Sequence, residues 1–165
     1  ECIKKLYEAS IAGVRIDLIV RGICCLKSGI EGVSDNIRVI SIVGRYLEHS
    51  RIFYFQNRDN PKFFLSSADL MPRNLDRRIE VMFPVEDERL KKRLKSILEI
   101  VLKDTVKARL QFPDGKYKKV DRRGKPLVNS QEVLHKAAIS RLRKFEKERI
   151  SGLASNPVLR SREKS

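Results

Sequence analysis

The sequence predicts an α/β domain in which a mixed β-sheet is flanked by helices. Three observations support this fold class. Residues 2–20 show a helical pattern, then a glycine, then an apolar run with the composition of a strand. Residues 37–43 are a second such run, rich in β-branched side chains, and an amphipathic helical pattern begins after Pro84. Helices that alternate with strands along one chain are typical of α/β architecture.

The first elements each follow from a local pattern. Apolar side chains at spacings of three and four predict an amphipathic helix over residues 2–12, which Gly13 ends. Residues 14–20 predict a largely buried strand, because apolar residues dominate it. Residues 23–36 contain Gly29 and Gly32 and predict a loop. These glycines match neither a nucleotide-binding fingerprint nor a P-loop, so a plain turn is favoured over a phosphate-binding loop.

Two short strands, residues 51–56 and 62–65, are predicted around a polar turn at residues 57–61. His49 stands just before the first strand. The second strand leads into a loop in which Pro72 restricts the backbone. The polar residues of this loop are Ser66, Ser67, Asp69, Arg73 and Asn74. The pattern predicts that an imidazole, a guanidinium and several hydroxyl and amide groups meet at one edge of a sheet, where they could hold a phosphoryl group.

The second half of the chain predicts a strand, a long helix, a short basic strand and a basic helix. Residues 78–83 alternate and predict a strand that Pro84 ends. The long helix has acidic residues at its start, and its apolar stripe consists of Leu90, Leu94, Ile97, Leu98, Val101 and Leu102. Residues 103–110 either extend it or begin a new short element. Turns at residues 112–115 and 122–126 enclose the strand at 116–120, and Ser130 predicts an N-cap for the basic helix at 131–150.

Length and cysteine content bound the class of protein. The 165 residues, 41% of them hydrophobic, suffice for one domain, expected over residues 1–150 and followed by a disordered tail over 151–165. Three cysteines without metal-ligand spacing predict buried, reduced thiols, which favours a cytoplasmic protein, with membrane association left open. No apolar run approaches the ~20 residues that span a membrane. Because the chain starts at Glu1, without a signal-like segment, we expect a piece of a longer protein.

The positive charge of the chain is concentrated near its C-terminus. The formal net charge is +15, and residues 116–165 contain 15 basic and 5 acidic side chains. Such a segment attracts polyanions. One hypothesis is therefore a non-enzymatic module whose basic helix binds nucleic acid or another polyanion.

The sequence context of Arg21 and of the two histidines bears on function. Arg21 follows the first predicted strand, at the sheet edge where α/β proteins usually bind ligands. His135 lies among charged residues on the predicted last helix and is expected to be a surface residue. His49 has arginines nearby on both sides, and the pair Ser66 and Ser67 follows one hairpin later. A lone histidine is more often structural than catalytic, but this layout favours a phosphate site at His49.

Five segments resemble the C-terminal catalytic region of bacterial polyphosphate kinases, which have a phospholipase D-like fold. They are residues 16–25, residues 29–43, Gly44-Arg-Tyr-Leu-Glu-His49-Ser-Arg51, Leu65-Ser-Ser-Ala-Asp69 and Met71-Pro-Arg-Asn-Leu-Asp76. The resemblance covers about residues 7–109, in the same order and without large gaps. It implies reversible transfer of the terminal phosphate of ATP to polyphosphate through a phosphohistidine. In the family that histidine belongs to an upstream domain, so the isolated chain is expected to be inactive.

The resemblance also implies roles for individual residues. The position of His49 is that of the second family histidine, which contacts the phosphoryl group and suits general acid/base work. The position of Arg21 contacts the phosphates of the nucleotide. Magnesium is the implied cofactor, with its ligands upstream, so no metal ligand is expected in this chain. Further phosphate-lining candidates, on geometry alone, are Ser66, Ser67, Arg73 and Asn74. The implied partners are ATP, ADP, polyphosphate and the upstream domains, and we expect the full-length protein to be a homo-oligomer.

Elementary chemistry agrees with these roles. An imidazole both gives and accepts protons near neutral pH. A guanidinium supplies a two-pronged donor to phosphate oxygens, and phosphoryl transfer depends mainly on positioning and opposite charge. Phospholipase D relatives carry a lysine and an aspartate where this chain has Arg51 and Gln56. The missing aspartate counts against a third hypothesis, half of a phospholipase D-like nuclease.

Overall fold

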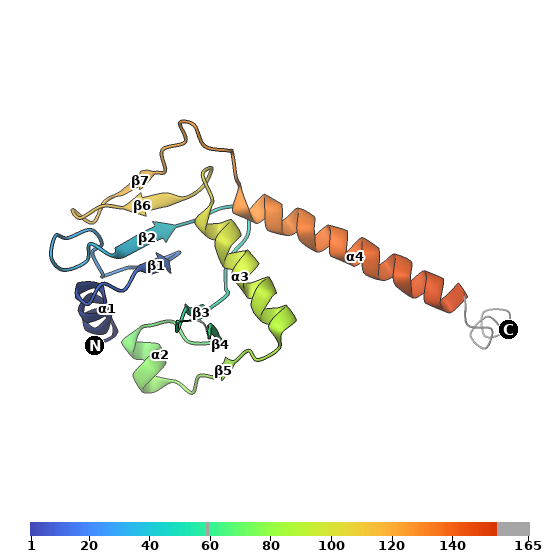
Figure 1. Cartoon of the computed structure of the whole chain (residues 1–165), viewed down its shortest axis with the longest axis horizontal. Coiled ribbons are helices and arrows are strands. Elements are labelled where there is room, and N and C mark those ends of the chain that lie inside the picture. The colour runs from blue at the N-terminus through green and yellow to red at the C-terminus, as the bar shows by residue number, and fades with distance from the viewer. Residues whose placement is uncertain (59, 155–165) are drawn as a thin grey trace. The chain divides into compact units, whose positions relative to one another are not determined.

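The computed structural model describes residues 1–58 and 60–154; for residues 152–154 it describes the backbone alone. The chain divides into two compact units, of which the first is Glu1–Ser130 and the second begins at Gln131 (Figure 1). The division falls before residue 150, the boundary expected for the domain. The described part of the second unit belongs to one helix, α4 (Ser130–Ala154). Of the predicted tail, residues 155–165 lie outside the described residues.

The first sheet has four strands in the order β1-β2-β6-β7. They are β1 (Ile16–Ile19), β2 (Ile37–Ser41), β6 (Arg109–Gln111) and β7 (Tyr117–Lys119). β1 runs parallel to β2, whereas β6 pairs antiparallel with both β2 and β7, so the sheet is mixed. The strand predicted at residues 14–20 is present, but the expectation that it is largely buried was wrong. β1 is an edge strand, its residues are only partly buried and Ile19 is exposed.

The core lies on both faces of this sheet, and β2 contributes to each. Ile37 and Val39 pack with α1 (Cys2–Ile11) in one cluster. Ile40 and Ile42 pack with the end of α3 (Glu88–Leu102) in the other. Successive strand residues point to opposite faces, which explains this alternation. Helices therefore flank the mixed sheet, as the sequence predicted.

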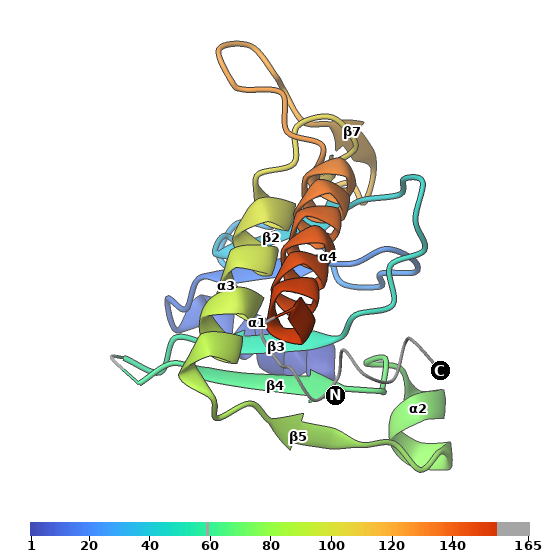
Figure 2. The same ribbon diagram turned by 90° about the vertical axis from the view of Figure 1, so that its right-hand side faces the viewer.

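The predicted hairpin belongs to a second sheet, so the expectation of a single mixed sheet was wrong. Its strands β3 (Ile52–Phe55), β4 (Lys62–Ser66) and β5 (Met82–Pro84) are antiparallel in that order. Figure 2 shows the three strands side by side, with α2 (Pro72–Arg77) beyond the end of β4. α2 lies in a segment predicted as loop; its first residue is Pro72, a position that proline favours. β5 starts later than predicted and includes Pro84, which an edge strand tolerates.

Helix ends are held by aspartates. Asp87 caps α3 by accepting hydrogen bonds from the N–H groups of Arg89 and Leu90. Asp104 lies just after α3 and accepts from both the N–H and the hydroxyl of Ser130, each at 2.7 Å. Ser130 is buried, so the last residue of the first unit is anchored to the loop after α3.

Two further expectations concern the chain as a whole. No helix among the described residues has the length and apolar character needed to cross a membrane. Cys2, Cys24 and Cys25 are free thiols, as expected. The expectation that all three are buried was wrong, because Cys25 is exposed and the other two are only partly covered.

Candidate functional site

The fold brings Arg21 and the segment of His49 together. Arg21 follows β1, and its backbone is held in place because Val20 N–H donates to Ile40 (2.9 Å) and the hydroxyl of Ser41 to the carbonyl of Arg21 (3.4 Å). A terminal nitrogen of the Arg21 side chain donates to the backbone carbonyl of Glu48, next to His49. Arg21 and His49 are both exposed. The guanidinium of Arg21 is therefore bound to the residue that precedes His49, and both side chains come from distant parts of the sequence to the surface.

Arg51 joins His49 to Asp69 across the base of the hairpin. One terminal nitrogen, Nη1, lies 2.9 Å from Nδ1 of His49 and 3.0 Å from the His49 carbonyl oxygen. At its other end Nε donates to Oδ1 of Asp69 at 3.0 Å. Ser66 N–H donates to the Arg51 carbonyl (3.1 Å), which fixes the register that brings these loops together.

The charge around Asp69 is positive. The hydrogen bond from Arg51 holds the pKa of the Asp69 carboxyl below its ordinary value, against the opposing effect of burial. The electrostatic effects of Arg51, then of His49 and Arg21, lower this pKa further. Asp69 is therefore ionised at neutral pH, within the electrostatic reach of all three cationic or ionisable groups. Sequence reasoning assigned no role to Asp69, although its place in the polar loop was the available signal.

The serines and asparagine of the predicted phosphate loop have protein partners. The Ser66 hydroxyl accepts from Ala68 N–H at 3.0 Å. Ser67 donates its hydroxyl hydrogen, and Asn74 an amide hydrogen at 2.8 Å, to the carboxylate of Glu80. These bonds hold the pKa of Glu80 below its ordinary value, Ser67 first and Asn74 second. The donors that a phosphate would need from Ser67 and Asn74 thus face Glu80, and a phosphate-lining role for them stays a prediction.

Two further candidates, Arg73 and His135, are exposed. Arg73 lies in the first turn of α2, and its side chain makes no hydrogen bond or ion pair within the described part of the chain. His135 is exposed on α4, as the sequence predicted for a surface residue. Asn74 differs from both, because it is buried at 3% exposure and its Oδ1 lacks a hydrogen-bond partner among the described residues.

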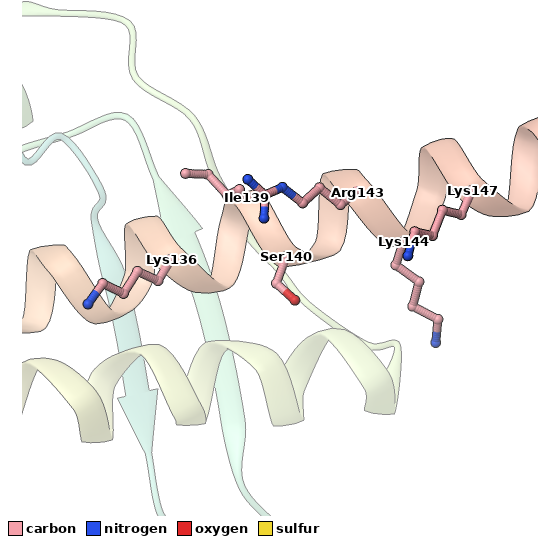
Figure 3. Close-up of a pocket in the computed structure, with 6 residues that line it drawn as sticks. All are labelled: Lys136, Ile139, Ser140, Arg143, Lys144 and Lys147. Carbon is pink, nitrogen blue, oxygen red and sulfur yellow. The ribbon is translucent and has the colours of Figure 1, made fainter.

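The second unit carries a separate group of cations. Figure 3 shows Lys136, Arg143, Lys144 and Lys147 along successive turns of α4. Together with Ile139 and Ser140 they line an open depression of the helix surface. Spacings of three, four and seven residues place them on one face. One of them, Lys144, forms a long ion pair with Glu148 (3.8 Å). We call this face the α4 stripe.

The implied magnesium raises the question whether the side chains of this chain form a cluster of metal ligands. Over residues 1–58 and 60–154, no group of three or more histidine, cysteine, aspartate or glutamate side chains is arranged to hold a metal ion.

Comparison with known proteins identifies the relatives of this chain. Residues 1–131 match the family model described as polyphosphate kinase C-terminal domain 2. A polyphosphate kinase of Prosthecochloris aestuarii is 57% identical over 152 residues, which cover 92% of this chain and 21% of that protein. A polyphosphate kinase of Bacillus cereus is 54% identical over 136 residues, which cover 82% of this chain and 19% of that protein.

The fold agrees with a solved structure of the same kind. The crystal structure of polyphosphate kinase from Porphyromonas gingivalis superposes with a TM-score of 0.78 at 45% identity, covering 89% of this chain and 22% of that one. The mixed α/β fold is thereby confirmed. The chain spans about a fifth of the length of the curated relatives it matches.

Proposed function

The chain belongs to the polyphosphate kinase family through its C-terminal domain, and we propose that it supplies part of the catalytic centre of such a kinase. The whole enzyme reversibly transfers the terminal phosphate of ATP to polyphosphate. The observation that carries this proposal is the meeting of Arg21, His49 and Arg51 at one exposed edge of the first unit. Because the chain is about a fifth of its relatives, the complete activity needs the other domains.

The chemistry divides between this chain and the upstream part. In the first step the bond between the terminal phosphorus and the bridging oxygen of ATP breaks, a bond to an upstream histidine nitrogen forms, and ADP leaves. In the second step that phosphorus–nitrogen bond breaks and the terminal oxygen of polyphosphate takes the phosphoryl group. Arg21 binds phosphate oxygens through its guanidinium. His49 transfers a proton or donates a hydrogen bond to the phosphoryl group. Positioning and charge govern the rate of this transfer.

Other assignments follow from the family resemblance. They are the phospholipase D-like arrangement, the magnesium ion held by upstream residues and the homo-oligomer. The cytoplasmic location rests instead on the free cysteines. Magnesium would offset the negative charge of the nucleotide phosphates. Within this chain, Arg21 and His49 bind the phosphate. Further candidates for lining the phosphate site are Ser66, Ser67, Arg73 and Asn74.

The test is His49→Gln in the full-length kinase, with radioactive ATP as phosphate donor and polymer as product. We expect kcat to fall by about 100-fold or more, the usual contribution of a group that transfers a proton or donates a hydrogen bond to developing charge in the transition state. Thermal unfolding should be unchanged, because the imidazole is exposed. The matched control is His135→Gln, which should retain full activity. A His49→Gln enzyme within twofold of wild type would exclude the catalytic role.

A second candidate function, binding of a polyanion by α4, is favoured by the α4 stripe. Its cations lie on one face, and its lining residues include no aromatic side chain on which a nucleic-acid base could stack. Polyphosphate, which offers only phosphate groups, fits this face better than nucleic acid. Binding by the stripe would be electrostatic and would weaken steeply with salt.

Competition tests this second function. Arg143→Gln with Lys144→Gln should weaken polyphosphate binding several-fold and lower the slope of log Kd against log salt by about one per cation removed. Arg141→Gln with Arg149→Gln removes the same charge from residues outside the stripe and serves as the control. Equal losses in both double variants would show that net charge alone binds the polymer. Displacement of polyphosphate by single-stranded DNA at equal charge would instead indicate a nucleic-acid site.

A further inference from the structure

The contact between Arg51 and His49 determines which ring nitrogen of His49 carries a proton. A guanidinium has five N–H donors, no acceptor, and no neutral form in proteins. The hydrogen bond of 2.9 Å therefore runs from Arg51 Nη1–H to the lone pair of His49 Nδ1. This bond exists only in a neutral ring whose hydrogen is on Nε2. Among the described residues Nε2 has no hydrogen-bond partner, so its N–H is available to a ligand.

We propose that Arg51 and Asp69 are positioning residues that hold His49 as the neutral Nε2–H tautomer, so that it donates a hydrogen bond to the phosphoryl group. This deepens the proposed function, on which the identity of the acceptor rests. His49 then acts as a fixed electrostatic donor, because its only unprotonated nitrogen is occupied by Arg51. Such preorganised donors stabilise charge that develops on oxygen in a transition state.

Two separate contacts fix the guanidinium itself. Arg51 donates through Nε to Asp69 on one side and through Nη1 to both the ring and the carbonyl of His49 on the other. The planar fork cannot rotate without breaking one of them. Asp69 stays ionised at neutral pH, because its pKa lies below the ordinary value. A lysine at position 51 would keep the charge, but its single ammonium nitrogen could not reproduce the geometry of the fork.

The first test reads the tautomer directly by ¹⁵N NMR on the 165-residue chain, with ¹⁵N-labelled histidine and His135→Gln for assignment. At alkaline pH, where imidazole is neutral, wild type should show His49 Nδ1 at the shift of an unprotonated nitrogen. In Arg51→Met, which lacks any donor, both ring shifts should move toward the averaged values of free histidine. A wild-type ring protonated on Nδ1, or ring shifts that Arg51→Met leaves unchanged, would overturn the proposal.

The second test is kinetic and uses the full-length kinase. Arg51→Met and Asp69→Asn should lower kcat about tenfold or more, with KM for ATP changed less than twofold, because they misplace a group that acts in the transition state. Arg51→Lys should not restore kcat. Arg45→Met, which removes the same charge from the same loop where Arg45 stacks on Tyr46, should stay within twofold of wild type.

The two tests separate the possible failures. If Arg51 binds substrate itself, Arg51→Met will raise KM and Asp69→Asn will leave kcat unchanged, which overturns the positioning role. If the catalytic role proposed for His49 is wrong, His49→Gln will remain active while the NMR result still establishes the tautomer. Unfolding of Arg51→Met is excluded as the cause of its lower kcat by comparing its thermal midpoint with that of Asp69→Asn.

Discussion

Two aspartates in the first unit, Asp104 and Asp69, differ in the groups that their carboxylates bind. Asp104 is buried at 3% exposure and accepts hydrogen bonds from four backbone N–H groups and one hydroxyl. The side chain of Asp69 is 46% exposed and accepts from the guanidinium of Arg51. Both have a pKa below the ordinary value. The partners of the carboxylate, rather than its charge or its pKa, separate the two.

The difference shows how partners reveal a role. A carboxylate that accepts from backbone N–H groups fixes the path of the chain, and Asp104 ties residues 106–108 to Ser130 in this way. A carboxylate that accepts from a cationic side chain orients that side chain and leaves the backbone alone. We therefore expect Asp104 to control stability and Asp69 to control the geometry of His49.

The largest expected effect is the loss of stability in Asp104→Ala. The substitution leaves several buried donors without an acceptor, each of which costs on the order of 1–3 kcal/mol when unpaired. We expect the free energy of unfolding to fall by about 3 kcal/mol or more, measured by urea denaturation. Asp76→Ala is the control, because Asp76 is exposed on α2, and it should change stability by less than about 0.5 kcal/mol. A loss below about 1 kcal/mol in Asp104→Ala would refute the structural role.

The pH dependence of stability sharpens this result. Burial alone would raise the pKa of Asp104, but hydrogen bonds from Ser130, Lys107 and Ala108 outweigh it and hold the pKa below the ordinary value. A carboxylate with a depressed folded pKa stabilises the fold fully above its unfolded pKa of about 4, and this contribution disappears as pH falls through the folded value. Urea unfolding below about pH 4 should therefore lose stability more steeply in wild type than in Asp104→Asn. Equal slopes would show that Asp104 does not titrate with folding.

Local patterns in the sequence predicted most elements, because they depend on neighbouring residues. The hairpin at β3 and β4, the helices α1 and α3 and the turns around β7 all follow from periodicity and turn residues. The division into two sheets does not, because strand pairing joins distant segments: Ile40 of β2 lies opposite Leu110 of β6. The six-residue α2 is too short to show a helical period, although Pro72 was a usable signal.

The candidate site shows the same limit. Arg21 and His49 could be selected from sequence because each stands beside a strand end. The role of Asp69 could not, because its bond to Arg51 depends on the hairpin register in which Ile52 lies opposite Leu65. Glu80 was missed for a related reason: it meets Ser67 and Asn74 only because β5 pairs with β4. Partners in space follow from the register, which single-residue patterns do not contain.

The smallest expected effect is the change in stability caused by Asp69→Asn. It tests the difference between Asp69 and Asp104 from the side of Asp69. Partly exposed ion pairs contribute about 0–1 kcal/mol, so the free energy of unfolding should change by less than about 1 kcal/mol. The midpoint and slope of urea unfolding at neutral pH measure this, with Asp104→Asn beside it as the buried counterpart. A loss in Asp69→Asn as large as that in Asp104→Asn would mean that Asp69 also holds the backbone. Its effect on His49 would then be a consequence of local unfolding, and the distinction between the two aspartates would fail.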